Sequence, residues 1–125
     1  MKKITLFVTL SMVIILAACS SSVPKVSADE ALDLMAEGAV LVDVRERYEH
    51  EENRIPGSTL LSLSVIEVLA PMRFDDLDTV IVVYCRSGRR SAEAAAILVD
   101  LGFTNVYDLG GINAWPYETL SGPVN

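Results

Sequence analysis

The run at residues 80–84 and the two segments that follow it constrain the fold more than any other feature. Val-Ile-Val-Val-Tyr is a continuous apolar, mostly β-branched run, which is typical of a strand buried on both faces. Residues 92–99, Ala-Glu-Ala-Ala-Ala-Ile-Leu-Val, favour a helix. Only the short stretch 85–91 separates the two segments, so the sequence predicts a strand, a tight loop and a helix.

The loop itself combines one sulfur with several positive charges. Cys85 stands at its first position, Gly88 lies in its middle, and Arg86, Arg89 and Arg90 are present without any acidic residue. The backbone amides that open the helix and the fixed positive charges therefore converge on a single thiol. We expect this loop to bind an anion or to stabilise a thiolate.

The rest of the chain alternates strands with helices. The expected elements are an edge strand at Val26, helices at 27–37, 47–53 and 62–69, and strands at 39–43, 59–61 and 105–108. Pro71 is expected to end the third of these helices, and Ser91 and Gly102 are expected to be the N-cap and the C-terminal stop of the helix after the loop. This order predicts an α/β fold with a mainly parallel sheet and a site at the carboxyl ends of its strands.

The loop at residues 84–91, Tyr-Cys-Arg-Ser-Gly-Arg-Arg-Ser, resembles the active-site loop of the rhodanese family of sulfurtransferases. Three further segments resemble other signatures of that family, in the same order: Leu-Val-Asp-Val-Arg-Glu at 41–46, Arg-Ile-Pro-Gly-Ser at 54–58 and Gly-Gly-Ile-Asn-Ala-Trp at 110–115. The resemblance implies a rhodanese-like three-layer domain with a mainly parallel five-stranded sheet flanked by helices. It also implies that the strand of Asp43 lies beside the strand of Cys85.

The resemblance further implies sulfur transfer. Cys85 would take a sulfane sulfur from an anionic donor such as thiosulfate, hold it as a persulfide, and pass it to cyanide or to a thiol acceptor. The residues expected to bind the substrate and to shape the loop are Arg86, Ser87, Gly88, Arg89 and Arg90. Their amides would form a nest around the sulfur.

The three arginines are expected to have different roles. Arg86 and Arg89 would attract the doubly charged donor, whereas Arg90 would turn inward and pair with Asp43. Asp43 and Arg45 would then support the loop from the neighbouring strand. We expect neither a cofactor nor a metal ion at this site.

The sequence departs from the family pattern before Ile-Pro-Gly. Glycine and histidine usually stand there, and this chain has Asn53 and Arg54, which we interpret as a structural substitution. We expect the nearby His50 to be a surface residue, although a Cys-His nucleophile pair with Cys85 is an alternative. Trp115 is expected to anchor the C-terminal segment by packing rather than to line the substrate mouth.

Two other functions share these features. Phosphatases and arsenate reductases resemble this fold and also use a cysteine in an arginine loop, but they have five residues between the two, whereas four separate Cys85 from Arg90. A tethered persulfide carrier or thiol-redox partner, which hands its sulfur to another protein, is the second alternative. Discharge of the persulfide by cyanide and small thiols would distinguish an enzyme from such a carrier.

The N-terminus predicts export. Lys2 and Lys3 are followed by an apolar run at 4–16 and by Leu-Ala-Ala-Cys at 16–19, which together resemble a bacterial lipoprotein signal. The apolar run is shorter than the ~20 residues of a membrane-spanning helix. We therefore expect a signal peptide at 1–18 and a lipidated Cys19, with a tether at 19–25, the domain at 26–120 and a tail at 121–125.

Charge and cysteine usage limit the partners. The formal charge is −7, and removal of the two leader lysines makes it more negative by two units, which argues against nucleic acid as a partner. We expect membrane contact through the N-terminal lipid only, on a bacterial membrane facing the periplasm or the cell exterior. If Cys19 carries a lipid, Cys85 has no partner for a disulfide in the chain.

Overall fold

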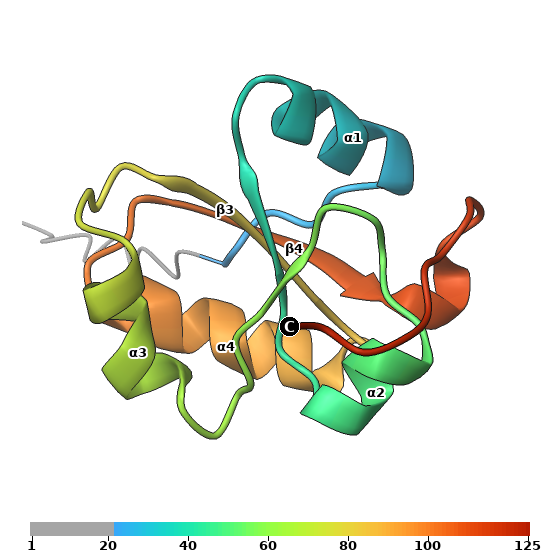
Figure 1. Cartoon of the computed structure of the whole chain (residues 1–125). Coiled ribbons are helices and arrows are strands. Elements are labelled where there is room, and N and C mark those ends of the chain that lie inside the picture. Colours follow the sequence, from blue (N-terminus) through green and yellow to red (C-terminus); the bar gives the residue numbers. More distant parts are fainter. Residues whose placement is uncertain (1–21) are drawn as a thin grey trace, which may run out of the picture.

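The computed structural model describes residues 22–125, which form a four-stranded parallel sheet with helices on both faces (Figure 1). The elements, in chain order, are α1 (Ala28–Ala36), β1 (Val40–Asp43), α2 (Arg47–Glu52), β2 (Thr59–Leu60), α3 (Ile66–Arg73), β3 (Val80–Cys85), α4 (Arg89–Asp100), β4 (Asn105–Gly111) and the 3-10 turn η1 (Ile112–Ala114). The strand order is β2-β1-β3-β4, and every neighbouring pair is parallel. The strand of Asp43 lies beside the strand of Cys85, as the resemblance implied.

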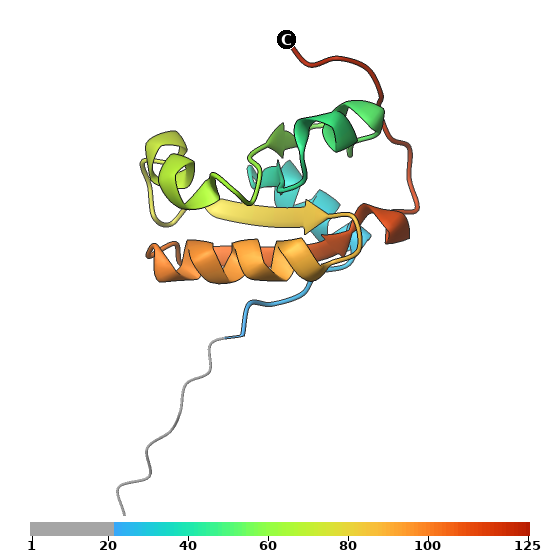
Figure 2. The ribbon, with the colours of Figure 1, turned by 90° about the horizontal axis from the view of Figure 1, so that it is seen from below.

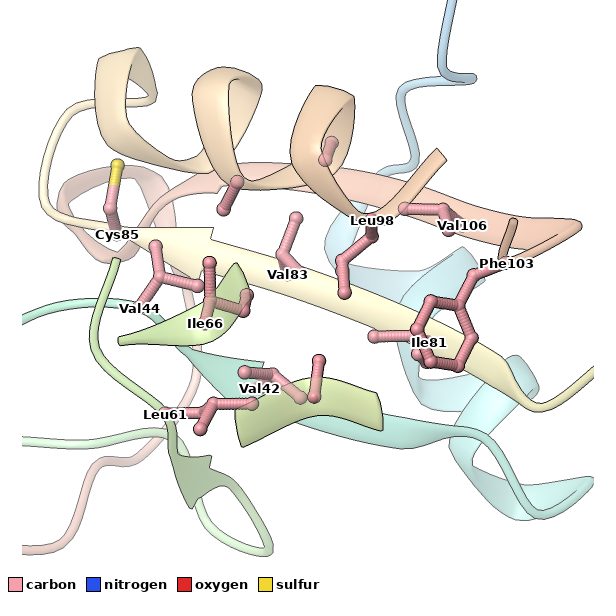
Figure 3. Packing of buried hydrophobic residues seen from close by; sticks show 13 residues of the cluster. Val42, Val44, Leu61, Ile66, Ile81, Val83, Cys85, Leu98, Phe103 and Val106 are labelled. Atoms are coloured by element: carbon pink, nitrogen blue, oxygen red, sulfur yellow. The ribbon is translucent and has the colours of Figure 1, made fainter. Parts of the chain in front are cut away.

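Two hydrophobic clusters fill the layers on either side of the sheet. Ile81, Val83 and Cys85 belong to the cluster beneath α3 and α4, whereas Val82 and Tyr84 belong to the cluster on the opposite face, with α1. This alternation follows from the two-residue period of a strand. It directs the Cys85 side chain toward α4 (Figure 3).

The first helix begins as its sequence predicts. The Ser27 hydroxyl accepts a hydrogen bond from the Glu30 amide at 3.1 Å, and the Glu30 carboxylate accepts one from the Ser27 amide at 3.0 Å. This reciprocal capping box satisfies two amides that the helix leaves without intrahelical partners. The helix stops before Gly38, whose φ of +106° is accessible to glycine and strained for other residues.

The described part of the sheet has four strands, where five were expected. The segment around Val26 does not extend into an edge strand, because Lys25 makes only an isolated bridge to Asp108. Pro24 lacks an amide hydrogen, and the capping box turns the chain into α1 directly afterwards. The backbone contact is limited to two hydrogen bonds of 3.0 and 2.9 Å, beside which the Lys25 ammonium donates to the Asp108 carboxylate at 3.1 Å.

The third helix lies further along the chain than expected. Its predicted start is instead bound to the residues after β1 and then forms a turn at 63–65: the Ser62 hydroxyl donates to the Arg45 carbonyl at 2.7 Å and the Leu63 amide to the Val44 carbonyl at 2.9 Å. The helix α3 then contains Pro71 instead of ending before it. The proline removes one intrahelical bond, and the last turn is closed by the Phe74 amide and the Ala70 carbonyl, 2.9 Å apart.

The last strand, β4, is longer than the expected 105–108 and includes the glycine pair. An irregularity between Val83 and Tyr84 shifts the register, so that Gly110 and Gly111 lie opposite Tyr84 and Cys85. This extension brings a backbone without side chains against the cysteine loop.

Among residues 22–125, no helix is both long enough and apolar enough to span a bilayer.

Candidate active site

The cysteine loop is shorter than expected. Only three residues separate β3 from α4, because Gly88 takes a φ of +107° and caps the helix. The expected N-cap, Ser91, therefore lies inside the first turn and is fully buried. Its hydroxyl donates to the Gly88 carbonyl at 3.0 Å. The helix thus begins three residues earlier than predicted and approaches the sulfur more closely.

The Cys85 sulfur accepts two backbone hydrogen bonds at the start of α4. The Gly88 amide lies 3.0 Å from Sγ and the Ser91 amide 3.3 Å. The residue is only 1% exposed, and no other cysteine of residues 22–125 pairs with its thiol. Two N–H groups and the positive end of a helix dipole therefore stabilise negative charge on this sulfur. The Gly88 amide belongs to the nest predicted at residues 86–90. The Ser91 amide lies outside that predicted nest and also donates to the sulfur.

The glycine pair of β4 forms the other wall of the loop. A Cβ atom on Gly111 would overlap with the Arg86 carbonyl, and one on Gly88 would contact Gly110 at 3.7 Å. The Asn113 amide, just beyond the strand, donates to the same Arg86 carbonyl at 3.2 Å. Glycine is thus needed at Gly111 because the loop backbone packs directly on the strand backbone.

Arg90 pairs with Glu49 of α2, and the predicted pair with Asp43 is wrong. Its two terminal nitrogens donate to the two carboxylate oxygens at 2.8 and 2.9 Å, which is the bidentate geometry that favours arginine. These bonds lower the pKa of Glu49 to about 2, even though burial opposes ionisation. The same bonds and the Glu49 charge raise the pKa of Arg90.

The other two loop arginines differ in their surroundings. Arg86 donates from Nε to Glu49 at 3.2 Å, lies 3.8 Å from Glu52, and remains 47% exposed. Arg89 is exposed and has no ion pair with any of residues 22–125. Arg89 therefore presents the least compensated positive charge of the loop.

Asp43 belongs to a separate, fully buried cluster. It accepts from Arg45 Nη2 at 2.7 Å and Nε at 3.0 Å, and lies 2.8 Å from Nδ1 of His50. Arg45 also donates to the Asn53 carbonyl at 2.6 Å. Burial lowers the pKa of Arg45, but the bonds to Asp43 and its charge outweigh burial and raise that pKa above its ordinary value. This cluster supports the end of β1.

His50 is not the surface residue that the sequence predicts. It is 1% exposed, and its Nδ1 is engaged by Asp43 rather than by Cys85. The Cys-His pair considered as an alternative is therefore not formed in the described structure. The buried charge of Asp43, which no local pattern around His50 indicates, explains why a histidine occupies this interior position.

Two other expectations concern the substituted positions and Trp115. Arg54 donates to the Gly122 carbonyl at 2.8 Å, and the Asn53 side-chain oxygen accepts from Arg45 Nη1 at 3.3 Å, so both substituted side chains make structural contacts. Trp115 packs against the cluster beneath α1 and meets the Tyr117 ring edge-on at 5.4 Å between centroids. This arrangement fits the expected packing anchor.

Cys19 lies outside the described residues, so its lipidation stays a prediction.

Sequence reasoning missed Glu49. The sequence indicates only an acidic residue on the short polar helix expected at 47–53, which begins at the same sheet edge as the cysteine loop. It does not indicate the direction in which that helix presents the Glu49 carboxylate. Within residues 22–125, no group of three or more His, Cys, Asp or Glu side chains is arranged to hold a metal ion.

Comparisons with known proteins agree with this geometry. The family model of the rhodanese-like domain matches residues 27–118. Thiosulfate sulfurtransferase GlpE of Pseudomonas entomophila is 41% identical over 108 residues, which cover 82% of this chain and 96% of that protein, and its counterpart in Pseudomonas syringae is 41% identical over 103 residues, covering 78% and 95%. Among solved structures, the human single-domain sulfurtransferase TSTD1 superposes with a TM-score of 0.65 at 29% identity, covering 74% of this chain and 94% of that one. The chain belongs to the rhodanese family.

Proposed function

We propose that the protein is a sulfurtransferase that moves the sulfane sulfur of thiosulfate to cyanide or to a thiol through a persulfide on Cys85. The observation that carries this function is the position of Sγ, which accepts hydrogen bonds from the Gly88 and Ser91 amides at the N-terminus of α4. The relatives named as thiosulfate sulfurtransferases support the choice of donor. The role of Cys85 follows from the chemistry of a stabilised thiolate.

The reaction takes place in two displacements at sulfur. In the first, the Cys85 thiolate attacks the outer sulfur of thiosulfate; a new S–S bond forms, the S–S bond of thiosulfate breaks, and sulfite leaves with the electron pair. In the second, cyanide attacks the outer sulfur of the persulfide, thiocyanate leaves, and the Cys85 thiolate returns. The amides of Gly88 and Ser91 stabilise the anionic sulfur at the start and at the end of this cycle.

The arginines supply the attraction for the donor. Arg89 is exposed and forms no ion pair within residues 22–125, so its full charge is available to attract an approaching dianion. Arg86 is shared with Glu49 at 3.2 Å, and we expect the donor to compete with that carboxylate for its guanidinium. Arg90 stays on Glu49 through two short bonds and holds the loop in place.

We further propose that the protein is exported and held at a bacterial membrane by a lipid on Cys19. The basic start, the apolar run at 4–16 and the Leu-Ala-Ala-Cys ending support this proposal. The domain would then sit on the tether at 19–25 and face the periplasm or the cell exterior. Cys19→Ser should release the protein from the membrane fraction, whereas wild-type protein that is already soluble and starts before Cys19 would contradict the proposal.

The thiosulfate:cyanide assay tests the activity, and the chain offers a matched pair of variants. Cys85→Ser should abolish turnover with the fold retained, because a hydroxyl is far less nucleophilic than a thiolate. Cys19→Ser makes the same substitution at the other cysteine and should keep kcat and KM. Turnover that survives in the Cys85 variant would exclude the mechanism.

Two other results would identify the alternative functions. A persulfide that forms but resists cyanide and small thiols would identify a carrier for a protein acceptor. Hydrolysis of aryl phosphates without a persulfide would identify a phosphatase.

A further inference from the structure

We propose that residues 113–122 form a C-terminal strap that positions α2, and through α2 the Glu49 carboxylate, against the arginines of the active loop. In this arrangement Arg54 is a positioning residue, because it ties the strap to the helix. The kinetic part of the inference rests on the proposed sulfurtransferase activity. The structural part rests on the contacts at the two ends of the strap.

The strap joins the active loop to α2. At its start, the Asn113 amide donates to the Arg86 carbonyl at 3.2 Å. At its end, the Gly122 amide donates to the Glu51 carbonyl at 2.8 Å. In Figures 1 and 2 the segment runs from the end of β4, past α2, to the C-terminus. One continuous stretch of chain therefore contacts both the cysteine loop and the helix that carries Glu49.

Arg54 fastens the far end of the strap through both its backbone and its side chain. Its amide and carbonyl pair with those of Leu120 at 2.8 and 2.9 Å, which makes an isolated antiparallel bridge. Its guanidinium Nη1 donates to the Gly122 carbonyl at 2.8 Å and to the His50 carbonyl, inside α2, at 3.3 Å. A single guanidinium thus links the strap to the helix directly.

The middle of the strap is also held. The Trp115 indole N–H donates to the Glu118 carbonyl at 3.2 Å, and the Tyr117 hydroxyl donates to Asp29 of α1. The Tyr117 ring packs edge-on against Trp115. The strap is therefore held between its ends. A contact at Gly122 thus connects α2 to a fixed segment, and it can restrain the helix in a way that a loose tail could not.

The helix α2 depends on such restraints. It has only six residues, too few to be stable by its own hydrogen bonds, so tertiary contacts decide where it lies. It presents Glu49 to Arg90 at 2.8 and 2.9 Å and to Arg86 at 3.2 Å. A displacement of about 1 Å would lengthen these bonds beyond normal hydrogen-bond range. The strap therefore acts on the loop cations without touching the substrate.

Arg54→Met tests the inference, because methionine keeps the apolar stem and the backbone bridge to Leu120 but removes every side-chain donor. We expect KM for thiosulfate to rise about fivefold with kcat within twofold, because Arg90 loses the fixed carboxylate through which it holds the loop in place, and Arg89 then loses its fixed position, while the thiol keeps its amides. Arg54→Lys, which keeps one cationic donor, should recover most of the affinity. Arg47→Met is the matched control: it removes the same charge from α2, where Arg47 makes only an exposed pair with Glu51 at 3.7 Å, and it should change KM less than 1.5-fold.

A double-mutant cycle with Glu49→Gln separates positioning from general destabilisation. If Arg54 acts through Glu49, the effect of Arg54→Met on KM should fall below 1.5-fold in the Glu49→Gln background. An equal effect in both backgrounds, or a loss of thermal stability without a change in KM, would overturn the inference. If Arg54→Met does not fold, Arg54→Gln replaces it in the same cycle. Wild-type turnover and persulfide formation are measured first, so a failure of the proposed function is recognised separately from a failure of the strap.

Discussion

Two ionic clusters lie at the carboxyl edge of the sheet, and they differ in burial and in the number of cations. Asp43, Arg45 and His50 form one cluster, in which all three side chains are buried and Asp43 is the common acceptor. Glu49 forms the other with Arg86 and Arg90, whose guanidinium groups are partly exposed. The two clusters are adjacent in sequence, since Glu49 and His50 are neighbours on α2.

The difference indicates which charges are available to a ligand. In the buried cluster the Asp43 carboxylate satisfies Arg45 and His50 within the interior, so an anion from solvent cannot reach them. In the Glu49 cluster one carboxylate serves two arginines at the protein surface. The first cluster therefore holds β1 and α2 together, and the second holds exchangeable cations beside Cys85.

The largest expected effect is the loss of the acid in the buried cluster. Asp43→Ala leaves the guanidinium of Arg45 buried without its partner, which should cost about 3–5 kcal/mol of unfolding free energy. Urea unfolding measures this change directly. A loss below about 1 kcal/mol would mean that solvent reaches Arg45 and that the two clusters are not as different as their burial indicates.

A smaller effect on stability, with a distinct pH dependence, is expected for Glu49→Gln. The pKa of Glu49 is lowered from 4.5 to about 2 in the folded protein, so its ionised form stabilises the fold above pH 4.5. That stabilisation should be lost as the pH falls from 4.5 toward 2. We expect Glu49→Gln to cost about 1–3 kcal/mol at pH 6 and to cost progressively less below pH 4.5. Urea unfolding at pH 6 and pH 3 checks this, and equal losses at both values would contradict it.

The smallest effect concerns the two exposed arginines of the loop. Arg89→Ala should raise KM for thiosulfate about fivefold, and Arg86→Ala about twofold, because Glu49 and Glu52 already offset much of the Arg86 charge. A neutral sulfane donor should show neither change. The reverse order of the two variants would indicate that the donor displaces Glu49 completely and that Arg86 is its main partner.

Local patterns in the sequence predict most of the fold. The capping box at Ser27 and the glycine stops at Gly38 and Gly102 place helix ends correctly, because each acts through the chain within a few residues. The sequence indicates Gly88 only as the middle of the loop. With its positive φ, Gly88 caps α4, so the helix begins earlier than it would with Ser91 as N-cap. This earlier start depends on the packing of the loop against β4, a contact between segments distant in sequence.

Side-chain pairing in the site is less predictable. The sequence correctly brings Cys85, Arg86 and Arg90 together at the junction of β3 and α4, but it assigns the wrong carboxylate to Arg90. Asp43 and Glu49 both lie at the carboxyl edge of the sheet. Which of the two carboxylates pairs with Arg90 depends on how α2 is rotated over that edge. The rotation is set by contacts that are distant in sequence, including those of Arg54 with the C-terminal strap.

Mass spectrometry of the intact, purified protein after treatment with thiosulfate tests the central claim most directly. We expect the mass to increase by one sulfur atom, with peptide mapping placing that atom on Cys85, and we expect cyanide to remove it. Cys85→Ser should gain no sulfur under the same conditions, while Cys19→Ser should gain it as the wild type does. An unchanged mass in a folded wild-type protein, or a sulfur that is added equally in the Cys85 variant, would contradict the account.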